Sequence, residues 1–87
     1  MLFYAYVLES SKDGKRYIGY TNNLKRRLEE HQKGLSRATK FRLPMNLIYF
    51  EACTNQVDAE RREGYLKSTR GNRFLAKRLL AYYQSRL

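Results

Sequence analysis

The stretch "FYAYVLESSKDGKRYIGYT", residues 3–21, predicts a β-hairpin. Its two ends, residues 3–9 and 16–21, are rich in the aromatic and aliphatic side chains that strands favour. The Asp13-Gly14 pair between them is a strong signal for a tight turn, because glycine readily adopts the positive φ that such turns need. Strands joined in this way are antiparallel neighbours, so the hairpin gives the fold its first two strands.

The segment that follows the hairpin predicts an amphipathic helix. Asn22 or Asn23 can cap its N-terminus with a side-chain oxygen, and we expect the helix to run to about Lys33. Leu24 and Leu28 form its apolar stripe, one helical turn apart. Because this stripe is narrow, most of the helix surface is expected to face water.

The remainder of the chain predicts a loop, a strand and two helices. Residues 34–44 are basic and have no clear apolar period, whereas residues 45–53 suit a third strand. Residues 54–68 have the pattern of a helix, the Gly-Asn pair at 71–72 is typical of a stop and a new cap, and residues 73–87 show helical spacing. The order β-β-α-β-α-α predicts one α+β domain over the whole chain, with helices packed on a small sheet.

The charge of the chain points to a polyanionic partner. Its 87 residues carry 18 Lys and Arg against 8 Asp and Glu, which gives a net charge of +10. A basic domain of this kind fits nucleic acid first, and an anionic membrane surface second. No run approaches the roughly 20 apolar residues that a membrane-spanning helix needs, so we expect no membrane insertion.

Cysteine and histidine are too few for most metal sites. Cys53 is the single cysteine, which excludes an internal disulfide and a zinc cluster, so we expect a reducing compartment, the cytoplasm. Magnesium needs only one or two carboxylates, because it keeps most of its water ligands and also takes phosphate oxygens. A single well-placed glutamate can therefore support metal-dependent phosphate chemistry.

Four polar side chains are expected to gather between the hairpin and the first helix. Tyr6 and Tyr17 can approach each other across the hairpin if it pairs regularly. Arg27 and His31 stand four residues apart, which places them on one helix face. Two hydroxyls, a guanidinium and an imidazole can then converge on one phosphate group.

Several segments, in order, resemble the GIY-YIG nuclease family, in its small stand-alone members, over about residues 4–80. The second half-motif is intact as "YIG" at 17–19, and the first is "YAY" at 4–6, which keeps only the final tyrosine. The segment "YTNNLKRRLEEH" at 20–31 is similar to the family's strand-to-helix segment with its arginine. The segment "DAERREGYLK" at 58–67 is similar to the helix that bears the metal-binding glutamate.

This resemblance implies a fold and a reaction. The fold is a three-stranded antiparallel β-sheet flanked by helices, and the reaction is hydrolysis of a phosphodiester bond with one divalent cation, Mg²⁺ or Mn²⁺. By analogy, Glu63 holds the cation, and Arg27 stabilises the negative charge that grows on the phosphate. Tyr17 or Tyr6 orients or deprotonates the attacking water, and His31 is the competing base.

The resemblance and the charge together predict DNA as the substrate. Six cations in the loop and in the C-terminal half can track a phosphate backbone: Arg37, Lys40, Arg42, Lys67, Arg70 and Arg73. Exposed aromatic side chains such as Tyr20, Phe41 or Tyr83 can stack unpaired bases, which favours single-stranded or branched DNA.

Other functional classes stay open beside the nuclease. Tyr4 and Ala5 replace the Gly and Ile of the first half-motif, which allows a non-catalytic, basic nucleic-acid-binding module on the same scaffold. A third hypothesis is a structural protein bound to ribosomal RNA. Taken singly, the candidate residues also have structural explanations: the hairpin tyrosines can be core aromatics, and Glu63 can simply pair with Lys67 one helical turn away.

Overall fold

The structure, a computed structural model, describes residues 1–86. Its elements follow the order β-β-α-β-α-α-α: β1 Phe3–Ser10, β2 Arg16–Thr21, α1 Leu24–Gln32, β3 Met45–Cys53, α2 Gln56–Lys67, α3 Thr69–Arg78 and α4 Leu80–Gln84. Within the described part of the chain, no helix combines the length and apolar character needed to cross a bilayer.

The three strands form one antiparallel sheet in the order β2-β1-β3, which confirms the predicted fold class. The central strand β1 is buried from Ala5 to Ser10, because it has a neighbour on both sides and helices on both faces. In the hairpin register, Tyr6 pairs with Gly19 and Leu8 pairs with Tyr17. This register decides which side chains of the two half-motifs meet.

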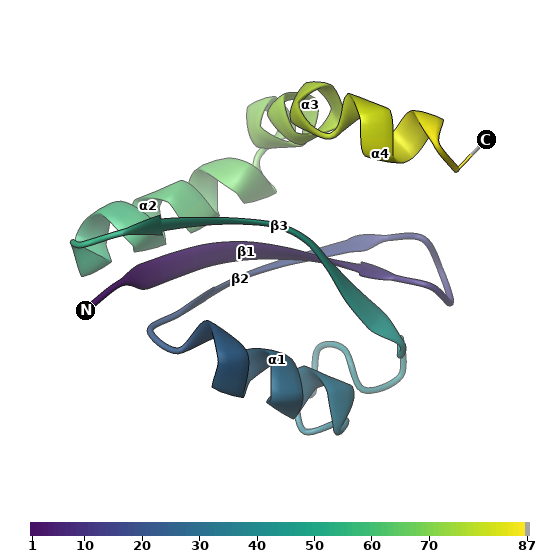
Figure 1. Ribbon diagram of the computed structural model, residues 1–87, viewed down its shortest axis with the longest axis horizontal. Coiled ribbons are helices and arrows are strands. Elements are labelled where there is room, and N and C mark those ends of the chain that lie inside the picture. The colour runs from purple at the N-terminus through teal and green to yellow at the C-terminus, as the bar shows by residue number, and fades with distance from the viewer. Residues whose placement is uncertain (87) are drawn as a thin grey trace.

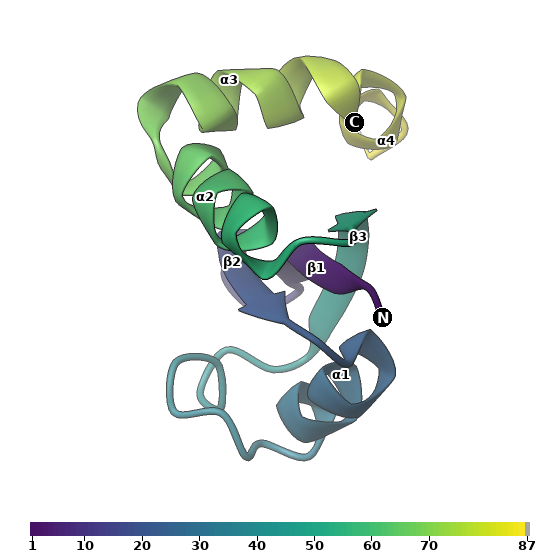
Figure 2. The same cartoon turned by 90° about the vertical axis from the view of Figure 1, so that its left-hand side faces the viewer.

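Helices cover the two faces of the sheet separately (Figure 1), and the layers are also seen in the turned view (Figure 2). Alternate residues of a strand point to opposite faces. Ala5 and Val7 therefore face one layer, where they pack with Leu66 of α2 and Leu75 of α3. Tyr6 faces the other layer, which α1 and the loop after it provide.

The first helix forms where the sequence predicts it. Asn23 is its N-cap, and the side chain of Asn23 accepts a hydrogen bond from the backbone of Arg26. Leu24 and Leu28 pack against the core cluster that contains Tyr6. The narrow apolar stripe thus fixes which face of α1 meets the sheet.

The loop of residues 34–44 is tied firmly to the hairpin. Arg42 donates from Nε to Oδ2 of Asp13 at 2.9 Å and from Nη2 to the carbonyl of Lys15 at 3.0 Å. The hydroxyl of Ser10 donates to the carbonyl of Arg42 at 2.6 Å. These bonds hold the loop against the same side of the sheet as α1.

The C-terminal helices differ from the sequence prediction. The predicted stop and cap at Gly71 and Asn72 is wrong, because Ser68 caps α3 and its hydroxyl accepts from the backbone of Gly71 at 3.1 Å. Instead of one helix over 73–87, α3 ends at Arg78 and the short α4 follows. Leu87, the last residue of the predicted helix, lies outside the described residues.

Gly71 has a packing role that local rules do not reveal. A Cβ at Gly71 would lie 2.5 Å from the Cα of Leu66, so only glycine lets α3 cross the end of α2 this closely. Gly64, in the middle of α2, contrasts with it, because a Cβ there would meet no atom within 4 Å.

The two helical glycines should therefore respond oppositely to alanine. Gly64→Ala should raise the free energy of unfolding by about 0.5–1 kcal/mol, because alanine has the higher helix propensity. Gly71→Ala should lower it by about 1–3 kcal/mol, because the added methyl group overpacks the crossing of α2 and α3. Urea denaturation of the two variants measures both effects, and shifts of equal sign would contradict this account of the crossing.

Candidate active site

Gly19, in the intact half-motif, leaves the space that the ring of Tyr6, in the altered half-motif, occupies. Tyr6 is only 1% exposed, and its ring lies across Gly19 on the neighbouring strand. A Cβ at Gly19 would lie 2.5 Å from the Cζ of Tyr6, so no larger residue fits beneath this ring. The ring of Tyr17 lies 6.4 Å from the ring of Tyr6, centroid to centroid, on the same face of the sheet.

His31 of α1 is enclosed beneath the two tyrosines. It is 1% exposed, and its Nε2 lies 3.0 Å from the hydroxyl of Tyr6. Its Nδ1 lies 2.7 Å from the hydroxyl of Thr39, in the loop after α1. Burial lowers the pKa of His31 to about 4, and the positive charge of Arg27 acts in the same direction. The imidazole is therefore neutral at physiological pH, with both nitrogens engaged inside the protein.

Arg27 is held in place by three neighbours. Its Nε donates to the hydroxyl of Tyr6 at 3.4 Å, Nη1 donates to Oε1 of Glu30 at 2.9 Å, and Nη2 donates to the hydroxyl of Ser36 at 3.4 Å. Burial alone would lower the pKa of Arg27, but the hydrogen bonds to Glu30 and Tyr6 raise it above its ordinary value. The side chain keeps 29% of its surface exposed, so this fixed cation still reaches solvent.

The two tyrosines lie in different environments. Burial raises the pKa of Tyr6 above its ordinary value, although the hydrogen bond from Arg27 opposes this, and the negative charge of Glu63 raises it further. Tyr6 is thus a neutral, enclosed phenol. Tyr17 is only partly buried and lines a surface cavity of about 540 Å³. Of the pair, Tyr17 is the residue that a ligand can contact.

Glu63 approaches the site from the opposite layer. It lies on α2, and Lys67 on the same helix pairs with its carboxylate at 3.3 Å. Lys67 lines the cavity that Tyr17 also lines, and the charge of Glu63 acts on the pKa of Tyr6. The structure therefore brings Tyr6, Tyr17, Arg27 and His31 into one cluster, whereas Glu63 lies on α2 in the layer on the other face of the sheet (Figure 1), from which its charge still raises the pKa of Tyr6.

The carboxylate of Glu63 is the one predicted metal ligand. Among residues 1–86, no three His, Cys, Asp or Glu side chains are grouped so that they could hold a metal ion. Zinc therefore has no suitable ligand set in the part of the chain that the structure describes. Magnesium does fit a single carboxylate that is 24% exposed, because water and phosphate oxygens supply its other ligands.

Of the three predicted DNA contacts in the loop, two are exposed and one is hydrogen-bonded within the fold. Arg37 and Lys40 are exposed, and the Nζ of Lys40 lies 4.9 Å from the ring centroid of Phe41. Arg42 is instead engaged by the hairpin, through Asp13 and backbone carbonyls. Its guanidinium connects the loop to the sheet.

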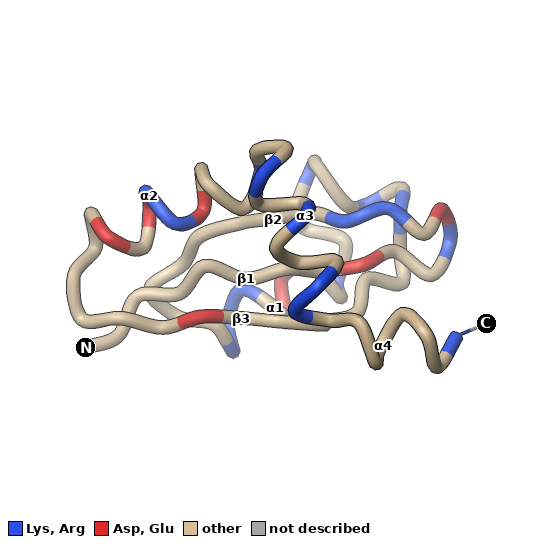
Figure 3. The backbone as a smooth tube through the Cα atoms, turned by 90° about the horizontal axis from the view of Figure 1, so that it is seen from above, with Lys and Arg blue, Asp and Glu red and all other residues tan. Residues whose placement is uncertain are grey.

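The predicted contacts on the C-terminal helices are all exposed. Lys67 lies at the end of α2, and Arg70 and Arg73 lie on α3. Figure 3 shows Lys and Arg along much of the chain, including α3.

Besides Glu30 on α1, two loop residues of the site, Ser36 and Thr39, were not predicted from the sequence. Both are buried, and they bond to Arg27 and His31 respectively. They belong to a loop without apolar periodicity, so no local signal distinguishes them from ordinary loop hydroxyls.

Comparisons with known proteins agree with this fold. A family model described as the GIY-YIG catalytic domain matches residues 2–78. The UPF0213 protein CPE1444 of Clostridium perfringens is 40% identical over 73 residues, which cover 83% of this chain and 77% of that protein. The UPF0213 protein SAG0778 of Streptococcus agalactiae is 46% identical over 65 residues, which cover 74% and 73%.

A solved structure shows the same arrangement. The solution NMR structure of the UPF0213 protein BH0048 from Bacillus halodurans is 34% identical in sequence and superposes with a TM-score of 0.55. The match covers 88% of this chain and 84% of that one. The chain belongs to the GIY-YIG domain family, together with the small UPF0213 proteins.

Proposed function

We propose that the chain is a divalent-metal-dependent endonuclease that hydrolyses phosphodiester bonds in DNA. Family membership implies a nuclease-type domain and a nucleic-acid substrate. The observation that carries the proposal is the cluster itself, in which Arg27 is a fixed guanidinium bonded to Tyr6, Tyr17 is a partly exposed neighbour of Tyr6, and the charge of Glu63 acts on the pKa of Tyr6.

The role assigned to Arg27 is to stabilise the negative charge that develops on the reacting phosphate. Glu30 and Ser36 hold its guanidinium before any substrate arrives, so little reorganisation is needed when charge develops. A guanidinium also offers paired donors that match two phosphate oxygens. The 29% of the side chain that stays exposed gives the phosphate access to it.

Tyr17 is assigned to the attacking water, which it orients or deprotonates. His31 is enclosed and bonded through both nitrogens, so it has no position from which to take a proton from that water. Tyr6 is enclosed as well, and its pKa is raised chiefly by burial. Tyr6 and His31 are therefore positioning residues, which fix the ring of Tyr17 and the guanidinium of Arg27.

Glu63 would hold the Mg²⁺ or Mn²⁺ ion. When bound, this ion neutralises charge on the phosphate and on the leaving oxygen. The chain's own contribution is a carboxylate that is partly exposed and already balanced by Lys67. Lys67 can release the carboxylate to a cation and turn to the DNA backbone instead.

The altered first half-motif does not favour the non-catalytic alternative. Ala5 lies in the core beneath α2 and α3, and Tyr4 packs against Phe50 with ring centroids 6.0 Å apart. Neither replacement reaches the hydrogen bonds of Tyr6. The half-motif thus keeps the tyrosine that the cluster uses.

The substrate is proposed to be single-stranded or branched DNA in the cytoplasm. Arg37, Lys40, Lys67, Arg70 and Arg73 are exposed cations that can follow a phosphate backbone. Arg42 is omitted, because the hairpin engages its guanidinium. Cys53 is a free thiol, which suits a reducing compartment.

Cleavage should depend on Glu63 and Arg27. With Mn²⁺ and single-stranded, duplex or branched DNA, Glu63→Ala should abolish cleavage, because the metal loses its protein ligand. Arg27→Ala should reduce the rate by about 10²–10³-fold, because the transition state loses a fixed donor. Gel assays of purified protein measure both rates, and circular dichroism shows that the variants are folded.

Glu60→Ala is the matched control for Glu63. Glu60 is an exposed carboxylate on the same helix that bonds to Gln56, one turn earlier. This variant should cleave at the wild-type rate, and the inactive Glu63→Ala protein, purified in parallel, excludes a contaminating nuclease. A wild-type protein that cuts none of the three substrates with either ion would refute the proposed activity.

Substitution of the two tyrosines should lower the cleavage rate to different extents. Tyr17→Phe should lower kcat by about 10²–10⁴-fold, as expected for a lost general base. Tyr6→Phe should lower it by only about ten-fold and should raise the pKa of His31, because that ring loses a buried partner and gains room for water. NMR titration of the His31 ring measures the shift, and a larger rate loss in Tyr6→Phe would reverse the assignment.

Acid should destabilise the protein through His31. The pKa of His31 is about 4 in the fold, below the ordinary 6.5, so between these values only the unfolded chain binds the proton. The free energy of unfolding should therefore fall by about 2 kcal/mol between pH 7.5 and pH 5 from this residue alone. In His31→Gln, this decrease in the free energy of unfolding should be absent. Urea denaturation of both proteins at the two pH values measures it, and a decrease of the same size in the variant would show that other groups cause it.

A further inference from the structure

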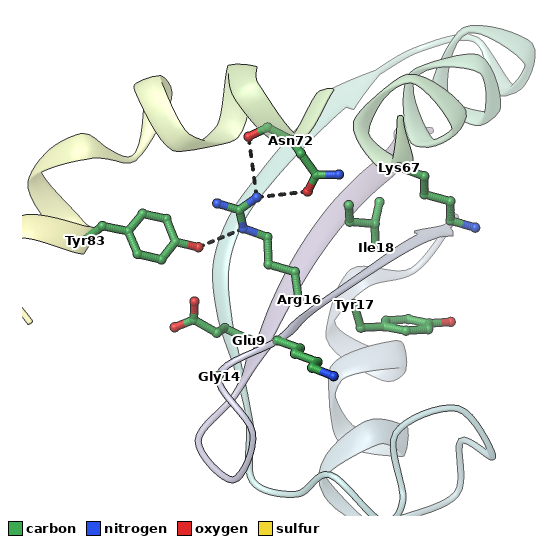
Figure 4. A pocket seen from close by; sticks show the side chains of 9 residues that line it. Glu9, Gly14, Arg16, Tyr17, Ile18, Lys67, Asn72 and Tyr83 are labelled. Atoms are coloured by element: carbon green, nitrogen blue, oxygen red, sulfur yellow. Dashed lines mark hydrogen bonds between the residues drawn. The ribbon is translucent and has the colours of Figure 1, made fainter. Parts of the chain in front are cut away.

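The part of the surface cavity around Arg16 has no role in the chemistry described so far. The cavity has a volume of about 540 Å³, within the range of cavities that bind small organic ligands. It opens at the β2 edge of the sheet, between the hairpin turn, the end of α2 and the helices α3 and α4 (Figure 4). Tyr17 stands at its border, and the Tyr17 ring lies on the other side of β2 from Arg16 (Figure 4), so the cavity and the candidate active site adjoin across this edge strand.

Arg16 is fixed within this cavity as a preorganised donor. Its Nε donates to the hydroxyl of Tyr83 at 2.8 Å, and its Nη1 donates to Oδ1 of Asn72 at 3.0 Å. The guanidinium carbon also lies 5.1 Å from the centroid of the Tyr83 ring. These contacts leave Nη2 without a hydrogen-bond partner among residues 1–86, so it can bind a ligand at little conformational cost.

The charge of the cavity favours an anion. Lys15, Arg16 and Lys67 contribute positive charge to the lining, and Glu9 is its one carboxylate. The side chain of Glu9 is only 4% exposed and already bonds to Tyr82 and Arg86. Its charge is thus compensated, and the remaining field attracts phosphate.

The lining also offers an apolar surface for the rest of a ligand. The half-buried ring of Tyr83 contributes carbon atoms beside the cations, with the buried Ile18 beneath, a combination that suits a phosphate joined to a base and a sugar. A cavity of this volume can hold one such unit. Lys67 of the lining also pairs with Glu63, so a strand whose nucleotide fills the cavity can continue around the β2 edge to the candidate active site.

We propose that this cavity binds one unpaired nucleotide of a DNA strand, next to the phosphodiester bond at Tyr17. The identity of the ligand rests on the proposed function, whereas the presence of the binding site does not. Arg16 and Lys15 contact the phosphate of this nucleotide, and Tyr83 contacts its base. A strand with an unpaired nucleotide at this position is bound, and a continuous duplex is excluded.

Binding of a mononucleotide without metal tests the site separately from cleavage. The wild-type protein is titrated in EDTA with 2′-deoxyadenosine 5′-monophosphate while the backbone amide signals are followed by NMR. We expect the shifts to be confined to the cavity, at Gly14, Arg16 and Asn72. Arg16→Ala should raise Kd by about ten-fold or more, as expected for a lost charge-assisted hydrogen bond.

Arg61→Ala is the matched control, because it removes the same charge from a side chain that is 75% exposed on α2 and pairs with Asp58. It should leave Kd unchanged. If the NMR spectrum of Arg16→Ala shows that this variant is misfolded, Lys15→Gln, at the exposed hairpin, is used in its place. Lys15→Gln should raise Kd by about three-fold or more.

Three results would overturn the proposal. Equal affinity for inorganic phosphate would mean an anion site without recognition of the nucleotide. An equal loss in Arg61→Ala would mean non-specific attraction to a basic protein, and shifts outside the cavity would mean binding elsewhere. Because no step involves hydrolysis, a protein that binds the nucleotide but cuts no DNA would refute only the proposed activity.

Discussion

The rest of the site depends on the two contacts of the Tyr6 hydroxyl, with Arg27 and with His31. It accepts a hydrogen bond from Arg27 and lies 3.0 Å from Nε2 of His31, and both Tyr6 and His31 are closed off from water. The buried phenol and imidazole lose their hydration on folding and the partly exposed guanidinium loses part of its own, so the three groups compensate by bonding to one another. Their bonds fix α1 against β1, and Gly19 leaves the space in which the phenol can lie.

Local signals in the sequence predict the parts of this arrangement that depend on local geometry. The Asp13-Gly14 turn and the Asn23 cap set the hairpin and α1, and these two elements together bring Tyr6 to His31. Contacts over long distances in the chain are not visible in the same way. Thr39 becomes the partner of His31 only because its loop folds back beneath α1, and no periodic pattern indicates that path.

Composition also overstates how many cations are available to DNA. Arg62 donates to both carboxylate oxygens of Glu51, at 2.8 and 3.0 Å, and its guanidinium carbon lies 4.8 Å from the ring centroid of Phe74. Arg78 lies 5.7 Å from the ring centroid of Tyr49. These side chains join helices to the sheet through charge and stacking. Only cations that neutralise phosphates contribute to the salt dependence of binding, so that dependence should be weaker than the net charge suggests.

The proposed catalytic cluster is assembled from both layers of the fold, and its members range from Tyr6 on β1 to Glu63 on α2. A polypeptide emerging from the ribosome therefore exposes the tyrosines and the arginine well before it exposes the carboxylate. Until α2 has been synthesised and docked on the sheet, a growing chain lacks Glu63, the carboxylate proposed to hold the metal. In the proposed nuclease, cleavage would therefore wait until α2 has docked on the sheet.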